Sequence, residues 1–328
     1  MRAVWFESFG AAKDVLRIGE LDKPKAGPGE VLVRVYTSSV NPSDVKKRAG
    51  SAPNLLDDGF VIPNSDGAGV IESAGAGVDA SRVGERVWLY QAQFARRFGT
   101  AAEYLAIDER RAVKLPDTVS FEVGACLGIP VMTAHRAVFA DSDVAGQRIL
   151  VTGGAGRVAN YAIQWASQAG ASVIATASNK ADEDACIEAG AQHVVNHRGK
   201  DVAGQILAAS DGDPVDRVVD VEFGANLPIT IEVLKVGGVI ATYGSAQVPE
   251  PQLPFYRMMY KDLTIRTIIV YAMPESAKQQ AIADIDKALR KEALHHRIAE
   301  TMPLADIVRS NELIEQGRIR GAVTLTVE

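Results

Sequence analysis

The sequence has few cysteines, no long apolar run and no cluster of basic residues. Cys126 and Cys186 are its only cysteines, so a structural zinc site with four cysteine ligands is excluded. No apolar stretch is long enough to span a membrane, and the N-terminal residues lack the charged-then-apolar order of a secretion signal. We therefore expect a protein of the reducing cytoplasm with no membrane partner.

The charge balance is slightly acidic, with 35 Lys and Arg against 41 Asp and Glu and a formal net charge of −6. Nucleic acid is not predicted as a partner, because phosphate binding needs a basic face. Small molecules are the better candidates. The hydrophobic content of 47% is typical of a globular protein, and a length of 328 residues predicts two domains.

The most informative stretch runs from Arg148 to Lys180, where the pattern predicts a strand, a glycine-rich turn, a helix and a second strand. The turn, Gly154-Ala155-Gly156-Arg157-Val158-Ala159, fits the G-x-G-x-x-G/A signature of dinucleotide-binding domains. Glycines there let the backbone approach a pyrophosphate held at the helix N-terminus. The alternative is a tight turn that is purely structural.

The order of predicted elements divides the chain. The first part is dominated by short strands and turns, whereas strands alternate with helices after the glycine turn, as in a doubly wound parallel sheet. The last strand, Ala322 to Val327, is expected to return to the first domain. We predict a β domain from residues 1–122 and 271–328, an inserted cofactor domain from residues 123–270, and a cleft between them.

The order of motifs resembles the zeta-crystallin-like quinone oxidoreductases of the medium-chain dehydrogenase/reductase superfamily over essentially the whole chain. Besides the glycine turn, the resemblance rests on Val40 to Asp44, Ser65 to Glu72, Gly128 to Ala134, Gly190-Ala191 and Asn196 to Arg198. It implies a Rossmann domain inserted in a GroES-like, mostly β catalytic domain. The chain departs from the family pattern at Arg157 and Ala159, where glycine is usual; Arg157 would either crowd the pyrophosphate or add positive charge beside it.

The resemblance also implies that no metal is bound. Zinc-dependent alcohol dehydrogenases of this superfamily carry a cysteine where Asn41 stands, a His-Glu pair where Ser65-Asp66 stand, and another cysteine near Ile129. Without zinc the enzyme has no strong Lewis acid, so its acceptor must already be activated. Quinones and α,β-unsaturated carbonyls (enones) meet this condition, because resonance stabilises the anion that hydride addition produces.

By family position, Asn41 and Thr133 are the expected polar contacts to the nicotinamide and its ribose, and Lys46 stands where relatives often place a tyrosine facing the substrate. Asn41 in an ordinary Asx-turn and Lys46 as a solvated charge are the alternatives. The expected cofactor-binding residues are Gly154, Ala155, Gly156, Arg157, Val158, Ser178, Lys180, His197, Gly244, Ser245, Ile269 and Arg320.

NADPH is predicted over NADH. NAD-specific Rossmann domains place an Asp or Glu at the end of the second strand, where a carboxylate would repel a 2′-phosphate. Here that strand ends in Ala177-Ser178, and Lys180, His197 and the tail residues Arg318 and Arg320 supply basic groups. The alternative is that Lys180 and the tail arginines are only solvated. The negative charge of Asp182 would offset part of the positive field of these basic residues.

The sequence therefore predicts a reductase that transfers hydride from NADPH to a quinone or enone. A non-catalytic, crystallin-like NADPH-binding protein and an alcohol dehydrogenase are the alternatives. A homodimer is expected through the predicted strand Leu263 to Val270, because the apolar, aromatic segment Phe255 to Tyr260 that precedes it is typical of interface cores and relatives commonly pair there.

Overall fold

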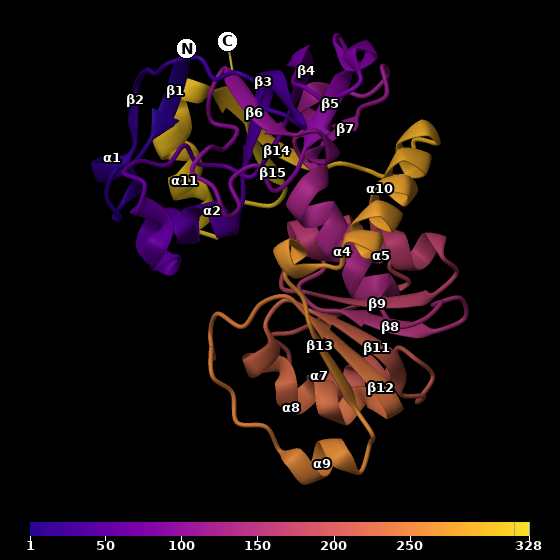
Figure 1. Cartoon of the computed structure of the whole chain (residues 1–328). Helices are drawn as coiled ribbons and strands as arrows, with labels where there is room; N and C mark the ends of the chain where they lie inside the picture. The colour runs from indigo at the N-terminus through magenta and orange to yellow at the C-terminus, as the bar shows by residue number, and fades with distance from the viewer. Residues whose placement is uncertain (318, 328) are drawn as a thin grey trace. The chain divides into compact units, whose positions relative to one another are not determined.

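The computed structural model describes residues 1–317 and 319–327, which form two compact units. The first unit combines residues 1–129 with the chain from Ile282 onward, and the second runs from Pro130 to Ala281 (Figure 1). Arg318 lies outside the described residues. Within the described ranges, no helix has the length and apolar character needed to cross a bilayer.

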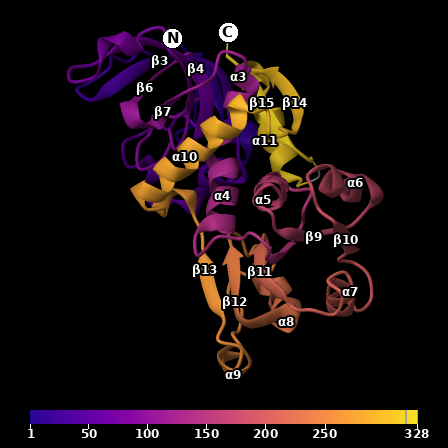
Figure 2. The same ribbon diagram turned by 90° about the vertical axis from the view of Figure 1, so that its right-hand side faces the viewer.

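The second unit is built on a parallel sheet of six strands in the order β10-β9-β8-β11-β12-β13 (Figure 2). The chain begins in the middle at β8, moves outward through β9 and β10, and returns to the other side of β8 at β11. This order is the Rossmann arrangement that the sequence predicts, and it reverses between β8 and β11. The strands are β8 (Arg148–Val151), β9 (Ser172–Ala177), β10 (His193–Asn196), β11 (Val215–Asp220), β12 (Leu234–Thr242) and β13 (Thr264–Thr267).

Helices connect these strands, as parallel pairing requires. The middle strand β8 is apolar and buried at Ile149, Leu150 and Val151, as expected of a strand covered on both faces. The helices are α4 (Met132–Phe139), α5 (Arg157–Gln168), α6 (Lys180–Glu188), α7 (Val202–Ala208), α8 (Phe223–Val233), α9 (Phe255–Met259) and α10 (Glu275–Arg290), of which the last crosses the division between the units.

One predicted strand is shorter in the structure. The apolar run Leu263 to Val270 forms only the four-residue strand β13, which ends at Thr267. Its neighbour β12 ends at Thr242, opposite Thr267. The remaining residues have no ladder to extend, and the chain turns into the 3₁₀ helix η6 (Val270–Ala272).

The first unit is a largely antiparallel β domain, as predicted. Its long central strand β3 pairs with β4 on one side, and with β6 and β15 along successive parts of the other. The tail strand β15 therefore belongs to this unit. The strands are β1 (Arg2–Trp5), β2 (Arg17–Glu20), β3 (Glu30–Val40), β4 (Asp66–Ala74), β5 (Arg86–Leu89), β6 (Tyr104–Asp108), β7 (Ala112–Lys114), β14 (Ile298–Pro303) and β15 (Ala322–Thr326).

Short helices surround this β domain. They are α1 (Ala12–Val15), α2 (Pro42–Lys46), η1 (Lys47–Ser51), η2 (Pro53–Leu56), η3 (Ala80–Arg82), η4 (Glu109–Arg111), α3 (Phe121–Gly124), η5 (Leu127–Val131), η7 (Leu304–Asp306) and α11 (Ile307–Glu315). Pro42 at the first position of α2 starts the helix directly after β3, because its fixed φ suits that position and no N–H is needed there.

Candidate cofactor and catalytic sites

The glycine turn joins β8 to α5 in the second unit. A Cβ on Gly154 would lie 2.6 Å from Cys186 Sγ and 3.0 Å from Ile163 Cδ1, so Gly154 permits close packing against α6 and α5. Gly156 differs. Among described residues outside its chain neighbours and own helix, a Cβ there would find only the Gly153 carbonyl oxygen within 4 Å, at 3.2 Å. The Gly156 side of the turn is therefore open to the close approach of a ligand.

The turn leads into a helix N-terminus that suits an anion. Gly156 is the N-cap of α5 and offers no capping side chain, and the first turn contains no acidic residue. The positive end of the helix dipole and the backbone N–H groups there favour a phosphate. Arg157 and Val158, which follow, are half-buried. The residues present fit a dinucleotide pyrophosphate.

The ends of β9 and β10 bring together two residues expected near the adenosine ribose. The backbone N–H of His197 donates to the carbonyl of Ala177 at 3.1 Å, so His197 lies beside the end of β9, where Ser178 follows. Ser178 is half-buried and His197 is exposed. Both lie at the carboxyl edge of the sheet, the edge at which open α/β sheets bind ligands.

Lys180, the predicted phosphate ligand, is engaged by acidic neighbours. Its side chain is 74% exposed, and its Nζ lies 2.7 Å from Asp184 and 3.3 Å from Glu183 on the same helix. The hydrogen bond to Asp184, followed by that to Glu183, raises the pKa of Lys180. A 2′-phosphate would compete with both carboxylates. Asp182 is buried and hydrogen-bonded to Asn179, which caps α6.

Four further predicted residues, Gly244, Ser245, Thr133 and Ile269, lie in the second unit. The loop after β12 is held against α8, since the Phe223 N–H donates to the Gly244 carbonyl at 2.8 Å and the Gly224 N–H donates to Ser245 Oγ at 3.0 Å. Thr133 is buried in α4, and Ile269 follows β13 with 57% of its surface exposed. The remaining predicted positions, Asn41, Lys46 and Arg320, belong to the first unit.

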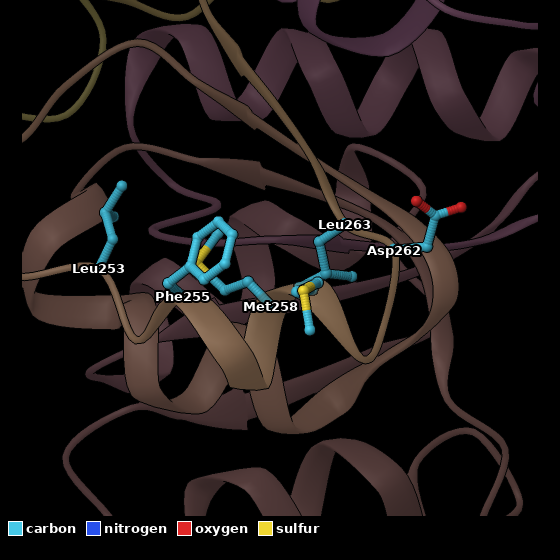
Figure 3. A pocket seen from close by; sticks show the side chains of 6 residues that line it. Leu253, Phe255, Met258, Asp262 and Leu263 are labelled. Carbon is cyan, nitrogen blue, oxygen red and sulfur yellow. The ribbon is translucent and has the colours of Figure 1, made fainter.

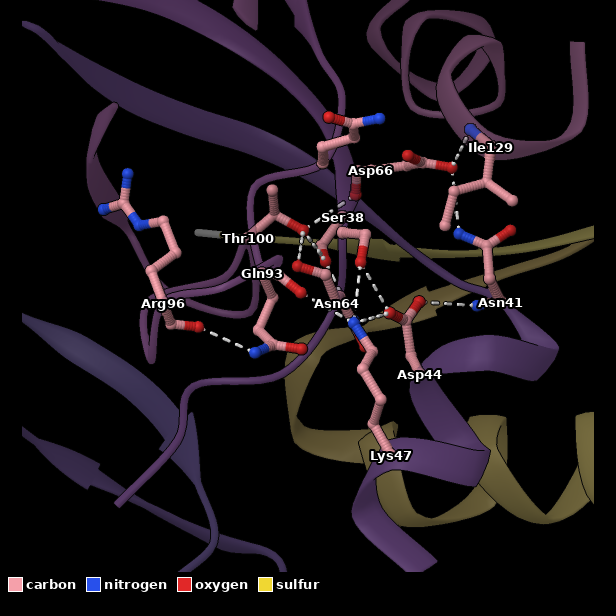
Figure 4. A network of polar contacts seen from close by, with 12 residues as sticks. Ser38, Asn41, Asp44, Lys47, Asn64, Asp66, Gln93, Arg96, Thr100 and Ile129 are labelled. Carbon is pink, nitrogen blue, oxygen red and sulfur yellow. Dashed lines mark hydrogen bonds and ion pairs between the residues drawn. The ribbon is translucent and has the colours of Figure 1, made fainter. Parts of the chain in front are cut away.

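A carboxylate joins three segments of the first unit (Figure 4). Asp66, the first residue of β4, has no exposed surface. Its Oδ2 accepts hydrogen bonds from Asn41 Nδ2 at 2.9 Å and from the Ile129 backbone N–H at 2.8 Å. The structure thus brings together the positions at which zinc-dependent relatives are expected to carry ligands.

The donors at these positions do not fit zinc. Asn41 offers an amide, Ser65 a hydroxyl, Asp66 a carboxylate already bonded to two N–H groups, and Ile129 an aliphatic side chain. Zinc in proteins prefers cysteine thiolates and histidine nitrogens. Throughout the part of the chain that the structure describes, no three His, Cys, Asp or Glu side chains lie close enough to hold a metal ion.

The adjacent lysines Lys46 and Lys47 differ in their exposure to solvent. Lys46 is exposed, whereas Lys47 is largely buried, and its Nζ donates to Ser65 Oγ at 3.0 Å and to the Gln93 carbonyl at 2.7 Å. Ser65 Oγ in turn donates to Asp44 Oδ1 at 2.8 Å. Sequence reasoning did not find Lys47. The one available signal was the i, i+3 spacing from Asp44, which favours an ion pair on a helix.

A Rossmann unit opened by the glycine turn, in a chain whose other unit is a β domain carrying the Asp66 network, defines the architecture of a medium-chain dehydrogenase/reductase. Family models match both parts: "Alcohol dehydrogenase GroES-like domain" over residues 27–117 and "Zinc-binding dehydrogenase" over residues 158–287. The second description names zinc, but the residues at the expected ligand positions, Asn41, Ser65, Asp66 and Ile129, do not suit that metal.

Curated relatives narrow the class. The chain is 31% identical over 250 residues to a quinone oxidoreductase of Mus musculus, covering 74% of this chain and 73% of the relative. It is 28% identical over 319 residues to that of Rattus norvegicus, covering 95% and 93%. A mycobacterial protein solved in complex with NADPH superposes with a TM-score of 0.88 at 26% identity, with both chains fully covered. The chain belongs to the zeta-crystallin-like quinone oxidoreductase family.

Proposed function

We propose that the chain is a zinc-independent oxidoreductase that transfers a hydride from NADPH to a quinone or an α,β-unsaturated carbonyl. The observation that carries this proposal is the set of hydrogen bonds from Asn41 and Ile129 to Asp66, at the positions of the expected zinc ligands. The names of the curated relatives and the NADPH in a similar structure support it.

The side chains at the expected zinc positions limit which substrates can accept the hydride. Reduction of a simple ketone or aldehyde builds negative charge on one oxygen, which a metal or a strong proton donor must stabilise. Hydride addition to a quinone or enone instead gives a hydroquinone or enolate anion whose charge is delocalised, and water can protonate it. When bound, NADPH supplies the hydride. The protein's task is to hold the reactants in a reactive orientation and exclude bulk water.

Each predicted residue has a place in this proposal. The backbone from Gly154 to Val158 would hold the pyrophosphate, and Ser178, Lys180 and His197 the adenosine ribose and its phosphate. Gly244, Ser245, Ile269 and Arg320 would complete the cofactor site. Asn41 and Thr133 would contact the nicotinamide or its ribose, and Lys46 would face the acceptor. We likewise propose residues 1–122 with 271–328 as the catalytic domain and residues 123–270 as the NADP-binding domain.

A screen of NADPH oxidation over simple quinones, enones, aldehydes and alcohols tests this function. We expect turnover with quinones or enones and none with saturated aldehydes or alcohols. Binding of NADPH without turnover of any acceptor would favour a crystallin-like binding protein. Turnover restricted to alcohols and saturated aldehydes would favour an alcohol dehydrogenase.

We further propose a cytoplasmic homodimer. The strand β13 is an edge strand of its sheet, so its outer side is available for pairing with a second copy. Close to it in sequence, α9 and its flanks expose Phe255, Tyr256 and Tyr260. A pocket of about 250 Å³ lies beside α9 (Figure 3). It is lined by Leu253, Phe255, Met258, Met259, Asp262 and Leu263. Exposed aromatic residues that directly precede an edge strand in the chain support assembly through this part of the second unit.

A further inference from the structure

We propose that Lys47 is a positioning residue for the hydride transfer, although sequence reasoning pointed to Lys46. The inference rests on the proposed function, because it assigns Lys47 the task of fixing Asn41 in that reaction. Only 14% of the Lys47 side chain is exposed. Its ammonium lies between α2 and the segments that carry Ser65 and Gln93 (Figure 4).

The protons of the Lys47 ammonium are all committed to the protein. Its Nζ lies 2.7 Å from the Gln93 carbonyl oxygen, 3.0 Å from Ser65 Oγ and 3.2 Å from Asp44 Oδ1. An ammonium group has three protons, and these three acceptors use them. Lys47 therefore has no proton to donate to an acceptor substrate, which makes its role one of positioning rather than catalysis.

The charge of Lys47 offsets a buried negative charge. Asp44 and Asp66 are both buried carboxylates of the same network, and Lys47 forms the ion pair with Asp44. A buried carboxylate is costly unless a cation or several hydrogen bonds stabilise it. Without the ammonium group, the buried Asp44 carboxylate would lose its ion-pair partner, and its hydrogen bonds would be expected to rearrange.

The position of Asp44 in turn determines the position of Asn41. The backbone N–H of Asn41 donates to Asp44 Oδ2 at 3.0 Å, and the Asn41 side chain donates to Asp66 Oδ2 at 2.9 Å. The two carboxylates thus hold Asn41 by its backbone and by its amide. Lys47 stabilises one of these two contacts, the one between Asp44 and the Asn41 backbone. Loss of its charge should leave Asn41 present but less well oriented.

The surrounding chain should remain folded when Lys47 is changed. Arg48, the next residue, is also buried and extends to a different set of partners. It donates to Asn311 Oδ1 at 3.3 Å and forms an ion pair with Glu315, both on α11, and it also bonds the Gly10 carbonyl. These contacts anchor η1 independently of Lys47.

The test is a single-turnover experiment in which the NADPH-loaded enzyme is mixed rapidly with a simple quinone and the loss of NADPH absorbance is followed. The variants are Lys47→Met, which removes the charge at similar length, and Lys47→Arg, which retains it. Lys13→Met, an exposed lysine on α1, is the matched control. The amplitude reports the fraction of competent enzyme, and the rate constant reports the reaction itself.

We expect Lys47→Met to lower the rate constant by about tenfold to a hundredfold, the range expected for misplaced reacting groups. Its amplitude and NADPH dissociation constant should stay within about twofold of wild type, and Lys47→Arg should recover most of the rate. A wild-type rate constant in Lys47→Met, or a loss confined to the amplitude, would overturn the inference and leave the proposed function standing. A wild-type protein that turns over no quinone would instead remove the proposed function, and this inference with it.

Discussion

Replacing Asp66 with alanine is expected to destabilise the first unit by about 3 kcal/mol. The substitution removes two hydrogen bonds to a buried charged acceptor, from Asn41 and from the Ile129 backbone. Each such bond contributes ~1.5–3 kcal/mol, and a buried donor left unpaired costs ~1–3 kcal/mol. Relief from burying the carboxylate itself offsets part of this loss. Asp66→Asn retains an acceptor oxygen in the same place, so we expect it to cost about half as much or less.

The assay is urea unfolding followed by tryptophan fluorescence. Trp5 and Trp88 lie in the first unit and Trp165 in the second. In a Trp165→Phe background, the fluorescence therefore reports the first unit alone. The Asp66 variants are compared within that background, so the effect of Trp165→Phe itself cancels. The dependence of the unfolding free energy on urea should not change, because the surface exposed on unfolding is nearly the same.

Two outcomes would refute this reasoning. A change below about 0.5 kcal/mol for Asp66→Ala is typical of an unimportant surface position and would mean that Asp66 does not join the three segments. Equal losses for Asp66→Ala and Asp66→Asn would show that the charge, and not the acceptor oxygen, carries the effect.

Lys180→Ala should weaken NADPH binding by up to about tenfold, or ~1.4 kcal/mol. The loss is limited because Asp184 and Glu183 compete with the 2′-phosphate for the Lys180 ammonium group. NADH binding should be nearly unchanged, because NADH has no 2′-phosphate. Titrations at fixed ionic strength, with Lys287→Ala as the exposed control, measure this, and equal losses for both cofactors would contradict it. Light scattering at micromolar concentration should give twice the chain mass of 35.0 kDa, and Tyr256→Glu should lower that mass toward a single chain; a wild-type mass of one chain would exclude the proposed dimer.

The Rossmann arrangement could be predicted because its signals are local. A short β-branched run, a glycine turn and a helix of apolar period follow one another between Arg148 and Gln168, and alternation of strands and helices then restricts the sheet to a few topologies. The ion pairs of Lys180 with Glu183 and Asp184 were missed, although their signal is equally local. Their spacing of three and four residues along a helix is readable in the sequence.

The Asp66 network could not be predicted from local pattern. Asn41 and Ile129 lie 25 and 63 positions from Asp66 along the chain, and only the folded β domain brings them together. Local pattern also did not show that Lys47, and not Lys46, is the buried lysine. Adjacent residues on a helix differ by about 100° in direction, and α2 has only five residues, too few for an apolar period to reveal its buried face.

The most direct test of a metal-independent NADPH reductase is metal analysis of the purified protein, followed by quinone turnover measured before and after dialysis against a strong chelator. The residues at the expected zinc positions, Asn41, Ser65, Asp66 and Ile129, predict no stoichiometric zinc and an undiminished rate of NADPH oxidation. One zinc ion per chain, with activity lost on its removal and restored on its return, would contradict the account.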